Sequence, residues 1–143
     1  MAASSPDRWE HFPHVADCGI RGYGATKAAA FAQTALAMLA LMVDPATVTP
    51  ASAIPIQCEA PDDELLLVDW LNALLYEMAT RQILFSAVQV ELKDHELQGT
   101  AWGETVDIQK HTLGVEVKGA TYTELGVRQL PDGSWLAQCV VDV

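Results

Sequence analysis

The spacing of apolar residues changes from a helical period to a strand period along the chain, and this change limits the folds open to it. Two long stretches in the earlier part repeat apolar side chains every three or four positions, as helices with one buried face do. The first stretch places on one face Ala28, Phe31, Ala32, Ala35, Leu39 and Met42. The second places on one face Leu67, Trp70, Leu71, Leu74, Leu75 and Met78. We interpret both faces as packed core rather than as ligand-binding surfaces.

Residues with capping or helix-breaking chemistry delimit both predicted helices. Thr26 precedes the first helix, where its hydroxyl can accept a hydrogen bond from the opening turn. Asp44 and Pro45 follow that helix, and proline cannot continue it. Asp62 or Asp63 can cap the second helix as Thr26 caps the first. The sequence therefore predicts two separate helices.

Strand patterns precede each helix. Residues 19–23 form a glycine-spaced segment before the first helix and read as a strand. Residues 52–60 lie between the helices and place Ile54 and Ile56 on one face, as a strand does. Pro55 has no amide hydrogen to donate, so we expect this second strand at the edge of a sheet.

The chain beyond the second helix consists of predicted strands and turns. Residues 86–94 alternate apolar and polar side chains, and residues 96–106 follow as the expected hairpin partner. Residues 114–130 and 134–143 supply further strands, joined in part by the turn sequence PDGS. This order predicts an α+β fold class, with two helices packed on mainly antiparallel sheet in a single domain.

Amino-acid composition limits the cellular compartment and the kinds of partner that suit this chain. The chain has 143 residues, of which we expect 1–8 to be a flexible N-terminus and 9–143 to be the domain. Its 8 basic and 19 acidic residues give a formal net charge of −11, which argues against direct nucleic-acid binding and suits a partner with a basic face. Three cysteines without a CxxC pair favour a reducing compartment. No secretory signal or membrane span is readable, so we expect a cytoplasmic protein.

Common catalytic motifs are missing from the sequence. It contains no phosphate-binding loop of the GxxxxGKS type, no GxSxG nucleophile elbow and no HExxH metal motif. The glycines of residues 19–24 lack the GxGxxG spacing of a dinucleotide site. Cys58 and Cys139 fall on apolar strand faces, where we expect core packing.

Polar residues at the ends of predicted elements are the remaining candidates for a site. They are His14, Asp17, Glu104, His111, Lys118, Thr121 and Asp142, and we expect His14 and Asp17 in the first loop. Taken singly, each residue of this kind is more often solvated or part of a turn than a ligand. Asp142 is unusual because the α-carboxylate of Val143 follows it directly, and hard divalent cations prefer such oxygen ligands.

Taken together and in order, these residues resemble the archease family. The opening His14-Val15-Ala16-Asp17 and the run Gly24-Ala25-Thr26 into an alanine-rich helix match its first motifs. Gly103-Glu104, then His111, the segment 117–122 and the closing VVDV match the later ones, so the resemblance runs from about Trp9 to Val143. Two departures are Ala29, where the family often has an acidic residue, and Gly119-Ala120 after Lys118, where the family usually has alanine followed by isoleucine or valine.

The resemblance implies a non-enzymatic activator of the GTP-dependent 3′-phosphate RNA ligase of tRNA splicing and RNA repair. Such a protein promotes guanylylation and multiple turnover of the ligase, and we expect it to be a monomer. The resemblance also implies a divalent metal site (Ca²⁺, Mg²⁺ or Mn²⁺) with ligands Asp17, Asp142 and Val143, and with His14 as a ligand or as support for one. The residues it implies for partner interaction are Lys118, Glu104, His111 and Thr121.

Two other readings stay open at this point. One is a generic acidic protein-interaction module whose charged end is simply solvated. The other is a divalent-metal-dependent hydrolase in which Asp17 and Asp142 hold a water-activating cation. Turnover by the isolated protein would favour the hydrolase, and activation that survives loss of both aspartates would favour the module.

Overall fold

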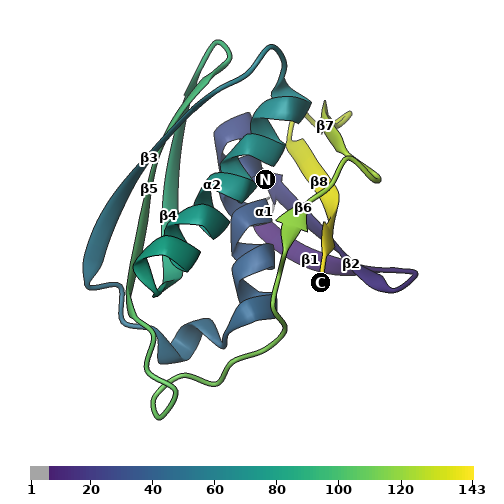
Figure 1. Ribbon diagram of the computed structural model, residues 1–143. Helices are drawn as coiled ribbons and strands as arrows, with labels where there is room; N and C mark the ends of the chain where they lie inside the picture. The colour runs from purple at the N-terminus through teal and green to yellow at the C-terminus, as the bar shows by residue number, and fades with distance from the viewer. Residues whose placement is uncertain (1–6) are drawn as a thin grey trace.

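Two antiparallel sheets with two helices between them make up the computed structural model, which describes residues 7–143 (Figure 1). Most of the predicted flexible segment, residues 1–6, lies outside the described part, and Arg8 begins the first strand. The larger sheet has the order β1-β2-β8-β6, with β7 also paired to β8. Its strands are β1 (Arg8–His14), β2 (Asp17–Gly24), β6 (Gly119–Ala120), β7 (Gly126–Gln129) and β8 (Trp135–Asp142). The smaller sheet has the order β3-β5-β4, with β3 (Ser52–Glu59), β4 (Ile83–Lys93) and β5 (Glu96–Thr105).

Both helices begin at the predicted caps. In α1 (Lys27–Met42), the amide of Ala29 donates to Thr26 Oγ1 at 3.0 Å. In α2 (Asp63–Arg81), the amide of Leu65 donates to Asp62 Oδ1 at 2.8 Å. A short 3-10 turn, η1 (Pro45–Thr47), follows α1 where Asp44 and Pro45 were expected to end it.

The hydrophobic core fills the space between the two sheets. Helix α1 contacts β2 and β4, and α2 contacts β3 and β6, so each helix touches both sheets. The predicted face of α2 is buried apart from the half-buried Leu75, with Trp70 and Leu71 at 0% exposure. The predicted face of α1 is buried in its middle, with Phe31 at 0% exposure, and half-buried elsewhere. Helix α1 is also buried beyond its predicted face, at Ala30, Thr34, Ala37 and Met38. The cause is that sheets flank it on opposite sides.

Close approach of α1 to β2 depends on a glycine. A Cβ atom at Gly22 would lie 2.3 Å from the backbone nitrogen of Thr34, a distance that real side chains do not tolerate. Thr34 then ties the helix to the sheet, because its hydroxyl lies 2.8 Å from the carbonyl of Ala30 and 3.1 Å from that of Ala137.

The predicted α+β class and most predicted strands are confirmed. Strands β4 and β5 form the expected hairpin, and β3 is an edge strand with Pro55 opposite Thr100. Residues 134–143 supply β8, which follows the PDGS turn. In that turn Gly133 has a φ of 92°, in the left-handed region that glycine adopts without strain.

Two predictions about the elements were wrong. The sequence reading placed His14 in a loop, but Arg8–His14 is an edge strand that pairs along its whole length with β2. Its side chains are exposed or half-buried, and none belongs to a buried apolar face, so the strand lacks the apolar alternation that reveals one in a sequence. Residues 114–130 were expected to be mainly strand, but regular pairing there is limited to β6 and β7.

The long connection between β5 and β6 is held by backbone contacts to the end of α1. We call residues 106–118 the strap. The amide of Gly114 donates to the carbonyl of Met42 at 2.8 Å, and that of Val115 donates to the carbonyl of Leu41 at 2.9 Å. These donors satisfy carbonyls that the last turn of a helix leaves free. Neither α1 nor α2, nor any other helix of residues 7–143, is long and apolar enough to cross a membrane.

Candidate functional site

The β1–β2 turn brings the first predicted site residues together. Val15 and Ala16 connect the two strands, and Ala16 has a positive φ of 64°. His14 therefore lies directly opposite Asp17 in the antiparallel register. Paired residues of an antiparallel sheet project to the same face, so their side chains leave the sheet on one side.

The second aspartate lies beside the first because of the register between β2 and β8. Cys18 pairs with Val141, so the next positions outward along the two strands are Asp17 and Asp142. Cys18 and Val141 pack on the helical core. Because successive side chains alternate between faces, both aspartates project from the outer face of the sheet. Among residues 7–143, neither carboxylate has a hydrogen bond or ion pair.

Strand β8 also accepts hydrogen bonds from residues of the chain segment that precedes β7. The amide of Lys118 donates to the carbonyl of Asp142 at 2.7 Å, and the Lys118 side chain is exposed. Thr121 donates through its hydroxyl to the carbonyl of Val140 at 2.7 Å. Six of the eight predicted site residues therefore lie at one sheet end, which we call the tip: His14, Asp17, Lys118, Thr121, Asp142 and Val143.

The tip carries donors of the kind that a divalent cation uses. Asp17, Asp142 and the α-carboxylate of Val143 offer oxygens, and Nδ1 of His14 is buried without a hydrogen-bond partner in the described part of the chain. The donor chemistry thus fits a cation. Within residues 7–143, however, no three His, Cys, Asp or Glu side chains are arranged to hold one. The ligand set stays a prediction.

The other two predicted residues, Glu104 and His111, form a separate cluster at the end of β5. Glu104 Oε2 accepts hydrogen bonds from Lys110 Nζ at 2.7 Å, from the amide of Thr49 at 2.7 Å and from His111 Nε2 at 2.9 Å. These bonds, that of Lys110 first, lower the pKa of Glu104 from 4.5 to about 2. Glu104 is therefore a carboxylate at neutral pH, with one oxygen fully used.

The hydrogen bonds of His111 decide its tautomer. Its Nδ1 accepts a hydrogen bond from the amide of Asp107 at 2.9 Å, so the proton resides on Nε2, which donates to Glu104. The His111 side chain has no exposed surface. The residue thus has an internal role in closing the start of the strap. Its predicted contact with a partner stays a prediction and would require this cluster to open.

Sequence reasoning missed a polar network on the same outer face as the tip. Arg21 donates to Glu10 at 2.6 Å and to Gln138 at 2.7 Å, which links β1, β2 and β8 side by side. The arginine also lies over the ring of Phe12, 4.5 Å from its centre. The signal in the sequence was the even spacing of the charged residues within β1 and within β2, which places them on one face. The network ties together the three strands that end in the tip.

Cys139 is buried in the core and Cys58 is half-buried against it, as the strand pattern predicted. Burial raises the pKa of the Cys139 thiol to about 12, and burial with the nearby Asp69 charge raises that of Cys58 to about 11. Both thiols therefore stay protonated at neutral pH, and protonated thiols are poor nucleophiles. All three cysteines are free.

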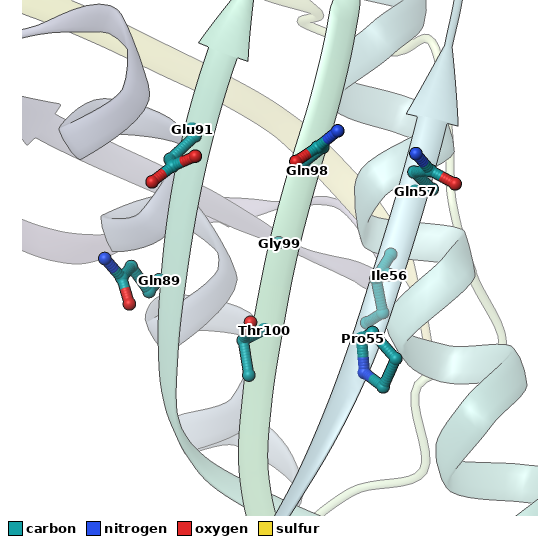
Figure 2. A pocket seen from close by; sticks show the side chains of 8 residues that line it. All are labelled: Pro55, Ile56, Gln57, Gln89, Glu91, Gln98, Gly99 and Thr100. Atoms are coloured by element: carbon teal, nitrogen blue, oxygen red, sulfur yellow. The ribbon is translucent and has the colours of Figure 1, made fainter.

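A hollow of about 510 Å³ lies on the open face of the smaller sheet (Figure 2). Figure 2 shows the side chains of Gln57, Gln98 and Glu91 side by side across the three strands, with Thr100 and Gln89 below them. This is the solvated face that the strand alternation predicts for residues opposite the core. We place the candidate site at the tip instead, because six of the eight predicted site residues gather there.

Two helices held between antiparallel sheets, with polar groups gathered where β1, β2 and β8 end, define a small α+β protein with a strand-end site. The model of the Archease protein family matches residues 9–143, and the chain belongs to this family. It is 41% identical to the protein named archease of Pyrococcus furiosus over 140 residues, 95% of this chain and 99% of the relative. It is 39% identical to that of Thermococcus gammatolerans, with the same coverage.

A solved structure agrees with this assignment. The chain superimposes on the solution structure of Methanobacterium thermoautotrophicum protein 1598 with a TM-score of 0.79 and 30% sequence identity. The match covers 94% of this chain and 98% of the other. The expected family and fold are thus both confirmed.

Proposed function

We propose that this protein is a cytoplasmic, non-catalytic activator of a GTP-dependent 3′-phosphate RNA ligase. It would promote guanylylation of the ligase and its multiple turnover in tRNA splicing or RNA repair. The observation that supports the proposal most is that the register of β2 and β8 brings Asp17 and Asp142 to neighbouring strand ends, with Lys118 bonded to Asp142, in a chain that belongs to the archease family. Residues so distant in sequence meet there on the outer face, open to a partner.

A divalent cation (Ca²⁺, Mg²⁺ or Mn²⁺) belongs to the proposal. Asp17 and Asp142 would hold it, with the carboxylate of Val143 and the free Nδ1 of His14 as further donors. When bound, it would supply a concentrated positive charge that attracts phosphate oxygens. Lys118 would act beside it as a second, extended point charge that reaches a phosphate or carboxylate of the ligase or its nucleotide.

The physical basis of activation would be differential binding. A ligase cleft that holds RNA must be basic, and an acidic chain of net charge −11 is attracted to it. The tip would bind better to the ligase conformation that is competent for nucleotidyl transfer than to the other one. A preference of about 1.4 kcal/mol is enough for a tenfold change in rate.

The alternative interaction module has one observation in its favour, since the carboxylates at the tip are not drawn together into a metal-binding group of three within residues 7–143. In that reading, the aspartates would contact basic side chains of a partner directly. Ligase activation that survives metal removal would identify it.

The test compares three variants in metal binding, ligase binding and guanylylation under multiple turnover. Asp142→Ala removes an oxygen ligand and should abolish metal-dependent activation. Lys118→Ala should lower guanylylation without lowering metal affinity. Glu91→Ala removes an exposed carboxylate from the smaller sheet and serves as the matched control, with wild-type behaviour expected.

Two results would contradict the proposal. If the wild-type protein fails to accelerate guanylylation of its cognate ligase, the proposed function is wrong. If Asp142→Ala activates at the wild-type rate while keeping a native melting curve, the tip is not the active surface.

A further inference from the structure

Exposed apolar side chains gather on the strap and beside the tip. Seven large hydrophobic side chains are exposed among the described residues. Three of them lie on the strap: Ile108 at 78% exposure, Leu113 at 50% and Val115 at 48%. Two more, Val15 and Tyr122, immediately follow tip residues in the chain. Scattered exposed apolar residues are ordinary, but their concentration on one segment is typical of a binding surface.

The strap is not a loose loop that happens to expose these residues. Gly114 faces the end of α1, because a Cβ atom there would lie 2.2 Å from the carbonyl oxygen of Leu41. Leu113 pairs with Val43 through an isolated bridge, and the amide of Val115 bonds to Leu41. Since Gly114 faces the helix, its two neighbours project away from it. Their exposure is therefore built into the backbone.

Both ends of the strap are also anchored. At its start, the buried His111 joins Asp107 to Glu104. At its end, the amide of Lys118 bonds to the carbonyl of Asp142, which makes the strap continuous with the tip. Figure 1 shows this segment running along one side of the molecule from the end of β5 to β6. A surface ordered in advance loses less conformational entropy on binding than a mobile one.

We propose that the strap is a docking surface for the partner ligase, and that its apolar side chains enter a patch on the ligase rimmed by basic residues. This inference rests on the proposed function, and it assigns affinity to the strap and activation to the tip. The exposed carboxylates of Asp44, Asp107 and Glu116 border the apolar residues, so a basic rim would complement them. A second copy of this chain is a poor occupant, because two chains of net charge −11 repel each other.

The test measures ligase affinity by calorimetry for the double variant Ile108→Ser/Leu113→Ser and for Ile108→Ser alone. Tyr76→Ser is the matched control, since Tyr76 is a similarly exposed residue of α2 at 65%. We expect the double variant to bind the ligase at least tenfold more weakly and the control to bind within twofold of wild type. Metal affinity should be unchanged in all three variants, because none of them touches the tip. Ile108 lies outside the backbone bridge between Val43 and Leu113, so the Ile108→Ser variant should keep the structure of the strap. Weaker binding by this single variant is then due to the lost side chain.

The outcomes separate this inference from the proposed function. Wild-type affinity in the double variant, with a ligase that binds the wild-type protein, overturns the docking role and leaves the proposed function standing. Failure of the wild-type protein to bind or activate the ligase overturns both. Sedimentation of the protein alone tests whether a second copy of this chain covers the strap. A dimer that is lost in the double variant would assign the strap to that second copy and reject the proposal.

Discussion

The carboxylates of this chain differ in how fully their oxygens are used. Glu104 accepts three hydrogen bonds through one oxygen and is held at the end of β5. Asp17 and Asp142 have no side-chain partner within the described residues, although the register places them side by side. Neighbouring like charges repel each other, and a bound cation would relieve that repulsion. The same type of side chain is thus structural at one place and open to ligands at the other.

Metal binding should depend on Asp17. Titration of the wild-type protein with Ca²⁺, Mg²⁺ or Mn²⁺ in a calorimeter should show one site, and Asp17→Ala should lose it because a hard oxygen donor is removed. The variant should melt like wild type, since Asp17 projects from the outer face. Unchanged affinity would take Asp17 out of the ligand set.

The bonds to Glu104 should make stability depend on pH in acid. Its folded-state pKa of about 2 lies below the ordinary 4.5, so its carboxylate form stabilises the fold fully above pH 4.5. That stabilisation should be lost as the pH falls from 4.5 to about 2. Denaturant unfolding at a series of pH values should show a steeper loss for wild type than for Glu104→Gln. Parallel curves across this window would contradict the assignment.

At the scale of elements, one face of the adjacent strands β2 and β8 packs on the core, and the other face carries the aspartates of the tip. Ile20 and Cys139, which are paired, are fully buried against the helices. Asp17 and Asp142 lie at the ends of the same two strands on the opposite face. Substitutions in the core and at the tip should therefore affect stability and function separately.

Helix α2 allows the core assignment to be tested. Leu71 is fully buried between the two sheets, so Leu71→Ala should lower the free energy of unfolding by about 2–5 kcal/mol through lost burial and a residual cavity. Asp69→Ala, at an exposed position of the same helix, should change it by no more than about 0.5 kcal/mol. Denaturant unfolding measures both. A loss below about 0.5 kcal/mol for Leu71→Ala would show that the packing is wrong.

For the whole molecule, the main property is the acidic field that surrounds a small site. The net charge of −11 acts on any partner before contact, whereas the roles proposed for the tip and the strap begin at contact. Charge therefore governs how fast a basic partner is found. Short-range contacts govern how long it stays.

Association with the ligase should accordingly slow as salt is added. Raising ionic strength from about 0.1 M to about 1 M shortens the screening length from about 10 Å to about 3 Å. With the metal kept saturating, the association rate should fall by about tenfold or more, and the dissociation rate should change less. Stopped-flow mixing measures both rates. A salt-independent association rate would remove the acidic field from the mechanism.

The sequence by itself determined the two helices, their caps at Thr26 and at Asp62 or Asp63, and the β4–β5 hairpin, because each depends on residues near one another in the chain. The ordered motifs also identified the family. Local periodicity and capping chemistry are legible without knowledge of the rest of the molecule.

Only the tertiary structure decided what long-range pairing brings together. Strand β1 exists because β2 pairs with it, and Asp17 reaches Asp142 through a register between the two ends of the chain. The tertiary structure also decided the burial of His111. It likewise exposed the apolar side chains of the strap, because Gly114 packs against the end of α1. Such contacts depend on register and on the close approach of distant backbones, and a pattern read along one segment contains neither.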